Sequence, residues 1–164
     1  MVRQGEKNDI YDIQKIFYES VDWMQDNHIK QWHYGDLKFI FSTFDWKEFF
    51  LCFNSQNKAV GFMILSIKDI NNCWAKLSLK NCIFLYKLTV RPNCTKLGYS
   101  SELLEFAVKY AAICKSRWLC LYCLKSKSKL MKLYENHGFH KVCEQIIPLE
   151  TEISAFYIYE IETK

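Results

Sequence analysis

The residues best suited to chemistry lie between Leu88 and Ser101, in the stretch LTVRPNCTKLGYSS. The pattern predicts an apolar strand, a turn at Pro92, a short polar loop that contains Gly98, and then a helix. Such a junction points several unpaired backbone N–H groups into one small space, where the helix dipole also favours an anion. The stretch therefore predicts a phosphate site. The alternative is that Ser100 or Ser101 only caps a core helix.

The charge distribution of the chain supports an anion site near this loop. Residues 1–69 carry 8 basic and 10 acidic side chains, residues 70–134 carry 12 and 2, and residues 135–164 carry 2 and 6. The positive potential is therefore concentrated around the loop. A basic face that only meets solvent would give the same counts, so the charge alone does not decide between these interpretations.

Eight cysteines raise the question of a disulfide framework or a metal site. They lie mostly within apolar strand and helix patterns, so we interpret them as reduced thiols, most of them buried. The one CxxC pair, Cys120 and Cys123, lies in the strand-like segment WLCLYC, where residues three apart point to opposite faces. We therefore expect neither a metal site nor a disulfide at this pair.

Length and composition bound the class of protein. The chain has 164 residues, half of them apolar, so we expect a single domain over residues 1–164 with its own core. No apolar run reaches the roughly 20 residues that span a bilayer, and the first residues, MVRQGEKND, lack the apolar centre of a signal peptide. The expectation is a cytoplasmic protein with no membrane partner.

The elements that must position the loop follow from the periodicity of the chain. The nearly continuous apolar run of residues 82–90 predicts a central strand, and the strand after the loop's helix should lie parallel to it. Gly61 within an apolar run indicates a bulge or a close backbone approach. The aromatic-rich residues 31–48 form either a lid that faces a substrate or a helix and loop packed on the sheet. Other expected strands are 1–4, 49–53, 59–67, 117–123, 142–147 and 155–161. A first helix is expected to begin at Asn8 or Asp9, and a second helical stretch to continue to about Lys30. Two further helices are expected at 103–114 and 128–136.

With this order of elements, the sequence resembles the GNAT superfamily of acyl-CoA N-acyltransferases. The match lies chiefly in LTVRPNCTKLGYSSELLEFAVKYA, residues 88–111, and in KLYENHGFHKV, residues 132–142. It extends more loosely to the opening strand and helix, the Gly61 strand and the final strand pair. The family's loop reads Gln or Arg, two variable residues, Gly, one variable residue, then Gly or Ala. The corresponding residues here are Thr95, Lys96, Leu97, Gly98, Tyr99 and Ser100, so two of the three signature positions differ.

The resemblance implies a fold and a cosubstrate. The fold would be a single-domain α+β (α/β) GNAT fold, with a mixed central sheet of about six to seven strands, a splayed central strand pair and about four flanking helices. The acyl donor would be acetyl-CoA, a coenzyme A thioester. Its pyrophosphate would bind the loop, and its pantetheine arm and thioester oxygen would bind free backbone groups of the fourth strand. The implied residues are Lys96, Leu97, Gly98, Tyr99, Ser100 and Ser101 for the loop, and Leu88, Thr89 and Val90 for the strand.

The family also implies catalytic roles. Tyr134 in LYENHGF falls where relatives often place the general acid, and a phenol stays protonated at neutral pH. The alternative is a core tyrosine on the helix face of Leu130 and Leu133. Many relatives use a carboxylate base on the fourth strand, but here the nearest place carries Lys87. A water relay to another side chain stays open, with Asp22, Asp26, Asp36 and His33 as the candidates.

The leading interpretation is an N-acetyltransferase that transfers an acetyl group from acetyl-CoA to a primary amine by direct attack in a ternary complex. The acceptor would be a small molecule or a peptide, with no metal and no nucleic acid, and a homodimer stays open. A first rival is an impaired acyl-CoA-binding sensor, because the loop is altered and a base is missing. A second rival, ranked low, is a basic RNA-binding module. Its residues would be Lys125, Lys127, Lys129 and Lys132 near Trp118 and Tyr122.

Overall fold

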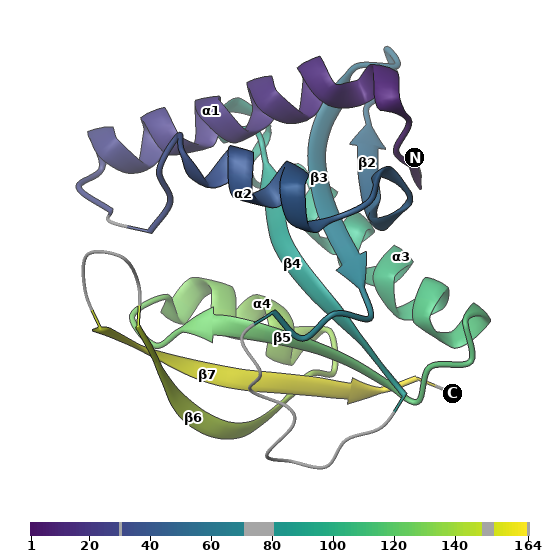
Figure 1. Ribbon diagram of the computed structural model, residues 1–164, viewed down its shortest axis with the longest axis vertical. Coiled ribbons are helices and arrows are strands. Elements are labelled where there is room, and N and C mark those ends of the chain that lie inside the picture. Colours follow the sequence, from purple (N-terminus) through teal and green to yellow (C-terminus); the bar gives the residue numbers. More distant parts are fainter. Residues whose placement is uncertain (30, 71–80, 149–152, 164) are drawn as a thin grey trace. The chain divides into compact units, whose positions relative to one another are not determined.

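The computed structural model describes residues 1–29, 31–70, 81–148 and 153–163 (Figure 1). The chain divides into two compact units, Met1–Leu65 with Lys87–Leu103, and Ser66–Tyr86 with Leu104–Lys164. Strand β4 and helix α3 each contribute residues to both units. The elements are β1 (Val2–Gln4), α1 (Ile10–Asp26), α2 (Asp36–Thr43), β2 (Phe49–Phe53), β3 (Ala59–Ser66), β4 (Cys82–Val90), α3 (Tyr99–Ile113), β5 (Trp118–Leu124), α4 (Ser128–Asn136), β6 (His140–Pro148) and β7 (Ile153–Glu162).

Strands β1, β2 and β3 of the first unit pair in antiparallel fashion. Every residue of β2 and β3 is buried, which explains why both strands are apolar on both faces. In the turn between them, the side-chain oxygen of Asn54 accepts hydrogen bonds from the backbone N–H groups of Gln56 and Lys58. The hairpin predicted for residues 49–53 and 59–67 is therefore confirmed.

Helix α1 is one continuous helix that ends at Asp26. The predicted second stretch is therefore helical only as the last part of α1, and its extension past Asp26 to Ile29 is wrong. The chain turns away at His28, whose φ of 55° is left-handed. The N–H groups of His28 and Ile29 then donate to the carbonyls of Gln25 and Met24. A left-handed residue that reverses the chain in this way terminates a helix, although here the residue is not the usual glycine.

Asp9 directly precedes α1, as predicted, but its carboxylate makes no side-chain hydrogen bond to the helix start. It accepts two hydrogen bonds from the Arg3 guanidinium, at 2.7 and 2.8 Å, and one from the backbone N–H of Glu6. The Arg3 guanidinium lowers the pKa of Asp9 below its ordinary value. The ion pair therefore holds the start of α1 beside β1.

The aromatic segment between α1 and β2 contains helix α2. Leu37 and Ile40 are buried on this helix, and the Phe41 ring packs against Phe49 of β2 with the ring centroids 5.8 Å apart. Of the two alternatives for this segment, a helix and loop packed on the sheet is therefore confirmed.

The second unit contains the first half of β4 with β5, β6 and β7. β4 pairs with β5 in parallel from Cys82↔Trp118 to Leu85↔Leu121, and β7 pairs in antiparallel fashion with both β5 and β6. The strand order β1-β2-β3-β4-β5-β7-β6 makes β4 the middle strand of seven. The described residues thus form an α+β fold with a mixed seven-stranded sheet and four α-helices, which confirms the predicted fold class and the central place of β4.

Helix α4 has the bounds predicted for it. It ends where Gly138 takes a left-handed φ of 85°, and the N–H of Phe139 donates to the carbonyl of Tyr134. Among the helices described in Figure 1, none is long and apolar enough to cross a membrane.

Candidate functional site

The loop between β4 and α3 lies wholly in the first unit. After β4, a single 3-10 turn covers Pro92–Cys94, and two residues then take left-handed backbone conformations, Lys96 with a φ of 64° and Gly98 with a φ of 86°. Left-handed residues alternate the direction of successive N–H groups and so form concave anion sites in loops. The geometry of the loop is therefore of the kind that binds an anion.

The backbone hydrogen bonds of this loop leave a row of free donors. The N–H of Thr95 donates to the carbonyl of Pro92, and the N–H of Glu102 donates to the carbonyl of Gly98 as the first bond of α3. Between these two donors, the six N–H groups of residues 96–101 have no hydrogen-bond partner in the described part of the chain. Six adjacent free donors at a helix start suit a group with several anionic oxygens.

Gly98 is required by its backbone conformation, because its φ of 86° is strained for residues with a side chain. A Cβ built on Gly98 would have no atom within 4 Å, so the space above the loop is open. The Thr95 hydroxyl donates to the Pro92 carbonyl at 3.0 Å. Thr95 therefore stabilises the turn, and exposed Lys96 is the one basic side chain in residues 92–98.

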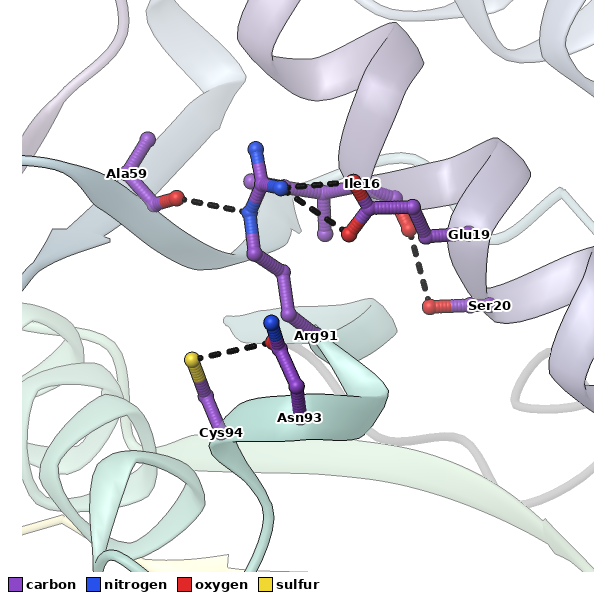
Figure 2. Close-up of polar contacts among 7 residues, drawn as sticks. All are labelled: Ile16, Glu19, Ser20, Ala59, Arg91, Asn93 and Cys94. Carbon is purple, nitrogen blue, oxygen red and sulfur yellow. Dashed lines mark hydrogen bonds and ion pairs between the residues drawn. The ribbon is translucent and has the colours of Figure 1, made fainter.

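Arg91 fixes the point at which β4 becomes the loop (Figure 2). Its backbone N–H donates to the carbonyl of Val60 at 2.8 Å, and its Nε donates to the carbonyl of Ala59 at 2.9 Å. Its Nη1 meets both carboxylate oxygens of Glu19 on α1, at 2.7 and 2.9 Å. With 11% of its side chain exposed, Arg91 ties the start of the loop to both β3 and α1.

The end of β4 is also held by a close backbone approach at Gly61. A Cβ on Gly61 would lie 2.6 Å from the carbonyl oxygen of Thr89, which confirms the close approach predicted there. The carbonyl of Thr89 and the N–H of Arg91 thus point toward β3. Because strand residues alternate, Leu88 and Val90 direct theirs to the opposite side. The backbone of residues 88–90 is therefore oriented as an added extended chain would require.

Lys87 lies just before these residues and interrupts the regular strand with a left-handed φ of 53°. Its ammonium lies over the ring of Trp32, 4.8 Å from the centroid, and 6.0 Å from the centroid of Phe17. Burial lowers the pKa of Lys87 to about 8, with Asp36 acting in the opposite direction. The place where relatives often carry an acid thus holds a half-buried cation.

Tyr134 lies on α4 in the second unit and is buried, with 4% of its surface exposed. Its ring packs against Phe139 and Tyr159 with centroid distances of 5.9 and 6.0 Å. Burial raises the pKa of Tyr134 above the ordinary phenol value, with a smaller contribution from Cys123. Its hydroxyl is therefore protonated at neutral pH, and it has no hydrogen-bond partner within the described ranges.

Two of the other candidate bases, Asp22 and Asp36, have local structural partners. Asp22 accepts a hydrogen bond from the Tyr34 hydroxyl, and the Asp36 carboxylate accepts one from the backbone N–H of His33. Asp26 is exposed at the end of α1. These contacts give two of the four candidate side chains, Asp22 and Asp36, a role in local structure.

Comparison with known proteins decides the family. Residues 7–139 match the acetyltransferase (GNAT) family. The chain belongs to the GNAT acetyltransferase family. No curated protein matches it.

Solved structures agree with this assignment at the level of the fold. The ribosomal-protein-S18-alanine N-acetyltransferase from Escherichia coli is 17% identical, with a TM-score of 0.73 over 100% of this chain and 94% of that one. A GNAT-family acetyltransferase from Listeria monocytogenes is 20% identical, with a TM-score of 0.73 over 99% and 94% of the two chains. A protein from Salmonella typhimurium, described as an acetyltransferase and solved with its cofactor acetyl-CoA, is 11% identical, with a TM-score of 0.72 over 100% and 94%.

The GNAT family uses acetyl-CoA, and the free donors of the loop suit its pyrophosphate. Phosphate oxygens accept from backbone N–H groups at helix starts, and residues 96–101 supply six such groups. Sequence reasoning located this loop but missed the Arg91–Glu19 pair and the rings around Lys87. An arginine directly before a proline at a strand end was the one local signal for the pair.

Proposed function

We propose that residues 1–164 form a single acetyl-CoA-dependent N-acetyltransferase domain that transfers an acetyl group to a primary amine. The observation that carries this proposal is the row of six partnerless N–H groups between the left-handed turn at Lys96 and the first bond of α3. Membership of the GNAT family supplies the donor, and the loop supplies backbone donors for its phosphates.

The reaction is direct attack in a ternary complex. Bound acetyl-CoA supplies a thioester, whose C–S bond breaks as the acceptor nitrogen bonds to the acetyl carbon. The backbone N–H of Val90 or Leu88 is oriented to donate to the thioester oxygen, where negative charge develops. Tyr134, which is protonated, donates its hydroxyl proton to the departing thiolate, and the acceptor nitrogen loses its proton to water.

A sensor without turnover is the first alternative, and the structure contains features that favour it. Thr95 serves the local turn, and no carboxylate stands on the described part of β4. Tyr134 packs as a core residue would. Measured turnover is therefore needed to separate the enzyme from the sensor.

The RNA-binding alternative is weakened by the contacts of its basic cluster. Lys125 forms an ion pair with Glu144 at 2.9 Å and lies 5.5 Å from the centroid of the Tyr157 ring. A lysine with a carboxylate partner contributes less to phosphate binding than a free one. We therefore keep this alternative below the other two.

The test begins with cofactor binding. Acetyl-CoA at 100 times its dissociation constant should stabilise the folded protein by about 2.7 kcal/mol in a thermal shift experiment. Gly98→Val should abolish the shift, because valine is strained at a φ of 86° and places methyl groups in the open space above the loop. Gly138→Ala is the control, since Gly138 has nearly the same φ, 85°, outside the loop.

Turnover is the second arm of the test. Thiol release from acetyl-CoA is measured across a panel of amines that includes amino acids, polyamines, aminoglycosides and peptides. Release with at least one amine class supports the enzyme. Cofactor binding without release for any amine supports the sensor, and unchanged binding in Gly98→Val removes the loop from the proposal.

A further inference from the structure

Lys87 takes a backbone conformation that strands normally avoid. A positive φ in a residue with a long side chain is uncommon, yet Lys87 has a φ of 53° in the middle of β4. Its carbonyl accepts a hydrogen bond from the Thr89 hydroxyl at 2.7 Å, which stabilises the irregularity. Irregular strand residues of this kind re-aim a side chain and are frequent next to functional sites.

The side chain that is aimed in this way is a cation in an aromatic setting. The Trp32 and Phe17 rings stack with centroids 5.6 Å apart and an interplanar angle of 14°, and the Lys87 ammonium lies over the Trp32 ring. In the parts of the chain that the structure describes, no carboxylate oxygen lies within ion-pair distance of this ammonium. Asp36 acts on it only at longer range.

A half-buried ammonium without a counter-ion is costly. Desolvation disfavours the charged form, and the two rings recover only part of that cost through cation–π attraction. The pKa of about 8 still leaves most Lys87 side chains protonated at neutral pH. An anionic group brought by a ligand would therefore meet an unpaired, poorly hydrated positive charge, where ion pairing is strong.

We propose that Lys87 binds an anionic group of the acceptor, so that the substrate is an amine that also carries a carboxylate. This inference rests on the proposed N-acetyltransferase function and narrows its acceptor class. The charge of Lys87 complements an amino acid. It opposes a polyamine, whose charges are all positive, because like charges in a desolvated site repel.

The position of Lys87 in the chain limits the size of the acceptor. Lys87 adjoins residues 88–90, whose backbone is proposed to hold the thioester. The carboxylate on its Nζ and the amine at the thioester are therefore separated at most by the reach of the Lys87 side chain plus three extended residues, on the order of 15 Å. This favours a short amino acid over a protein whose carboxylates lie at variable distances from the amine.

The first experiment compares acids with their neutral amides. Thiol release at saturating acetyl-CoA is measured for glycine, β-alanine and 4-aminobutyrate, and for the matching amino amides. With the wild type, kcat/KM for at least one acid should exceed that of its amide by about 10- to 100-fold, the effect of one charged hydrogen bond. Lys87→Met should remove that preference, measured as the ratio of kcat/KM for each acid to kcat/KM for its amide within the same variant. Lys87→Arg should keep the preference, because it keeps the charge.

Two outcomes of this experiment overturn the proposal. Equal kcat/KM for acid and amide in the wild type would show that no anion subsite is used. Loss of activity toward acids and amides alike in both Lys87→Arg and Lys87→Met would assign Lys87 to proton removal from the acceptor, because arginine keeps the charge but does not release a proton.

A second readout does not depend on turnover. Trace acetic anhydride labels neutral lysine amines, and mass spectrometry compares Lys87 with the exposed Lys58 in the same sample. The ligands are the N-acetylated products of the acids and amides used in the first experiment. Binding of the N-acetylated acids should raise the pKa of Lys87 and lower its relative labelling several-fold, whereas the N-acetylated amides should not. If no amine supports thiol release but the acids still protect Lys87, the proposed reaction fails and the anion subsite stands. If neither set protects Lys87, the subsite is refuted.

Discussion

Replacing Tyr99 by proline tests the anion loop through a single backbone hydrogen. Tyr99 is the first residue of α3, and the first helical bond runs from Glu102 to the carbonyl of Gly98. The Tyr99 N–H has no partner in the described structure, so proline removes no internal hydrogen bond there. Proline is favoured at the first helical position because its φ suits the helix. The variant should therefore fold, with one free donor fewer.

The matched control is Tyr99→Ala, which removes the same side chain but keeps the N–H. A hydrogen bond from a backbone N–H to a charged oxygen contributes about 1.5 to 3 kcal/mol. The dissociation constant of acetyl-CoA should thus be about 10- to 150-fold higher for Tyr99→Pro than for Tyr99→Ala. If the pyrophosphate bound elsewhere, the dissociation constant would be the same for both variants.

Isothermal titration with acetyl-CoA and with CoA measures both variants, and far-ultraviolet circular dichroism confirms that both are folded. The weakening should be the same for the two ligands, because both carry the pyrophosphate and only one carries the acetyl group. Equal affinities for the proline and alanine variants would refute the assignment of the pyrophosphate to this loop. Weakening for acetyl-CoA alone would place the lost contact at the acetyl group instead.

Four further predictions concern side chains. Tyr134→Phe should keep acetyl-CoA binding but lower kcat by about 100- to 10,000-fold if the hydroxyl is the general acid, and an equal kcat would make Tyr134 a core residue only. Arg91→Met leaves a carboxylate and a carbonyl without their donor, so urea unfolding should show a loss of about 1 to 3 kcal/mol; an unchanged midpoint would contradict the anchoring role. Because the pKa of Lys87 is lowered to about 8, the unfolded chain binds more protons between about pH 8 and 10.5. Wild-type stability should therefore rise with pH in this window relative to Lys87→Met, by up to about 3 kcal/mol, and parallel pH profiles of the two proteins would disprove the shift. Cys120 and Cys123 should titrate as free thiols with no stoichiometric zinc, and one zinc per chain in metal analysis would overturn this.

Periodic apolar patterns predicted the elements that bury a face. The bounds of β2 and α4 agree with the sequence expectation, and β4 lies at the centre of the sheet. The end of α1 was missed because His28, rather than a glycine, takes the left-handed conformation there. A histidine does not by itself predict a left-handed conformation. Here the backbone hydrogen bonds of the following turn stabilise that conformation.

The candidate site was predictable only where it is local in sequence. The loop follows from a strand, a glycine and a helix start that are contiguous in the chain. The Arg91–Glu19 pair joins residues 72 positions apart, and the rings around Lys87 come from α1 and the segment after it. Contacts of this kind depend on how elements pack, and no pattern within one element encodes them.

Helix α1 contacts two parts of the proposed site in the first unit, the Lys87 ammonium and the start of the loop at Arg91. Phe17 borders the Lys87 ammonium, and Glu19, two residues later, holds Arg91 at the start of the loop (Figure 2). Because helix residues two apart do not share a face, the two contacts fix both the position and the rotation of α1 against the end of β4. A change at Glu19 is therefore expected to alter acetyl-CoA affinity and the acid-to-amide preference together, whereas a change at Lys87 should alter the preference alone.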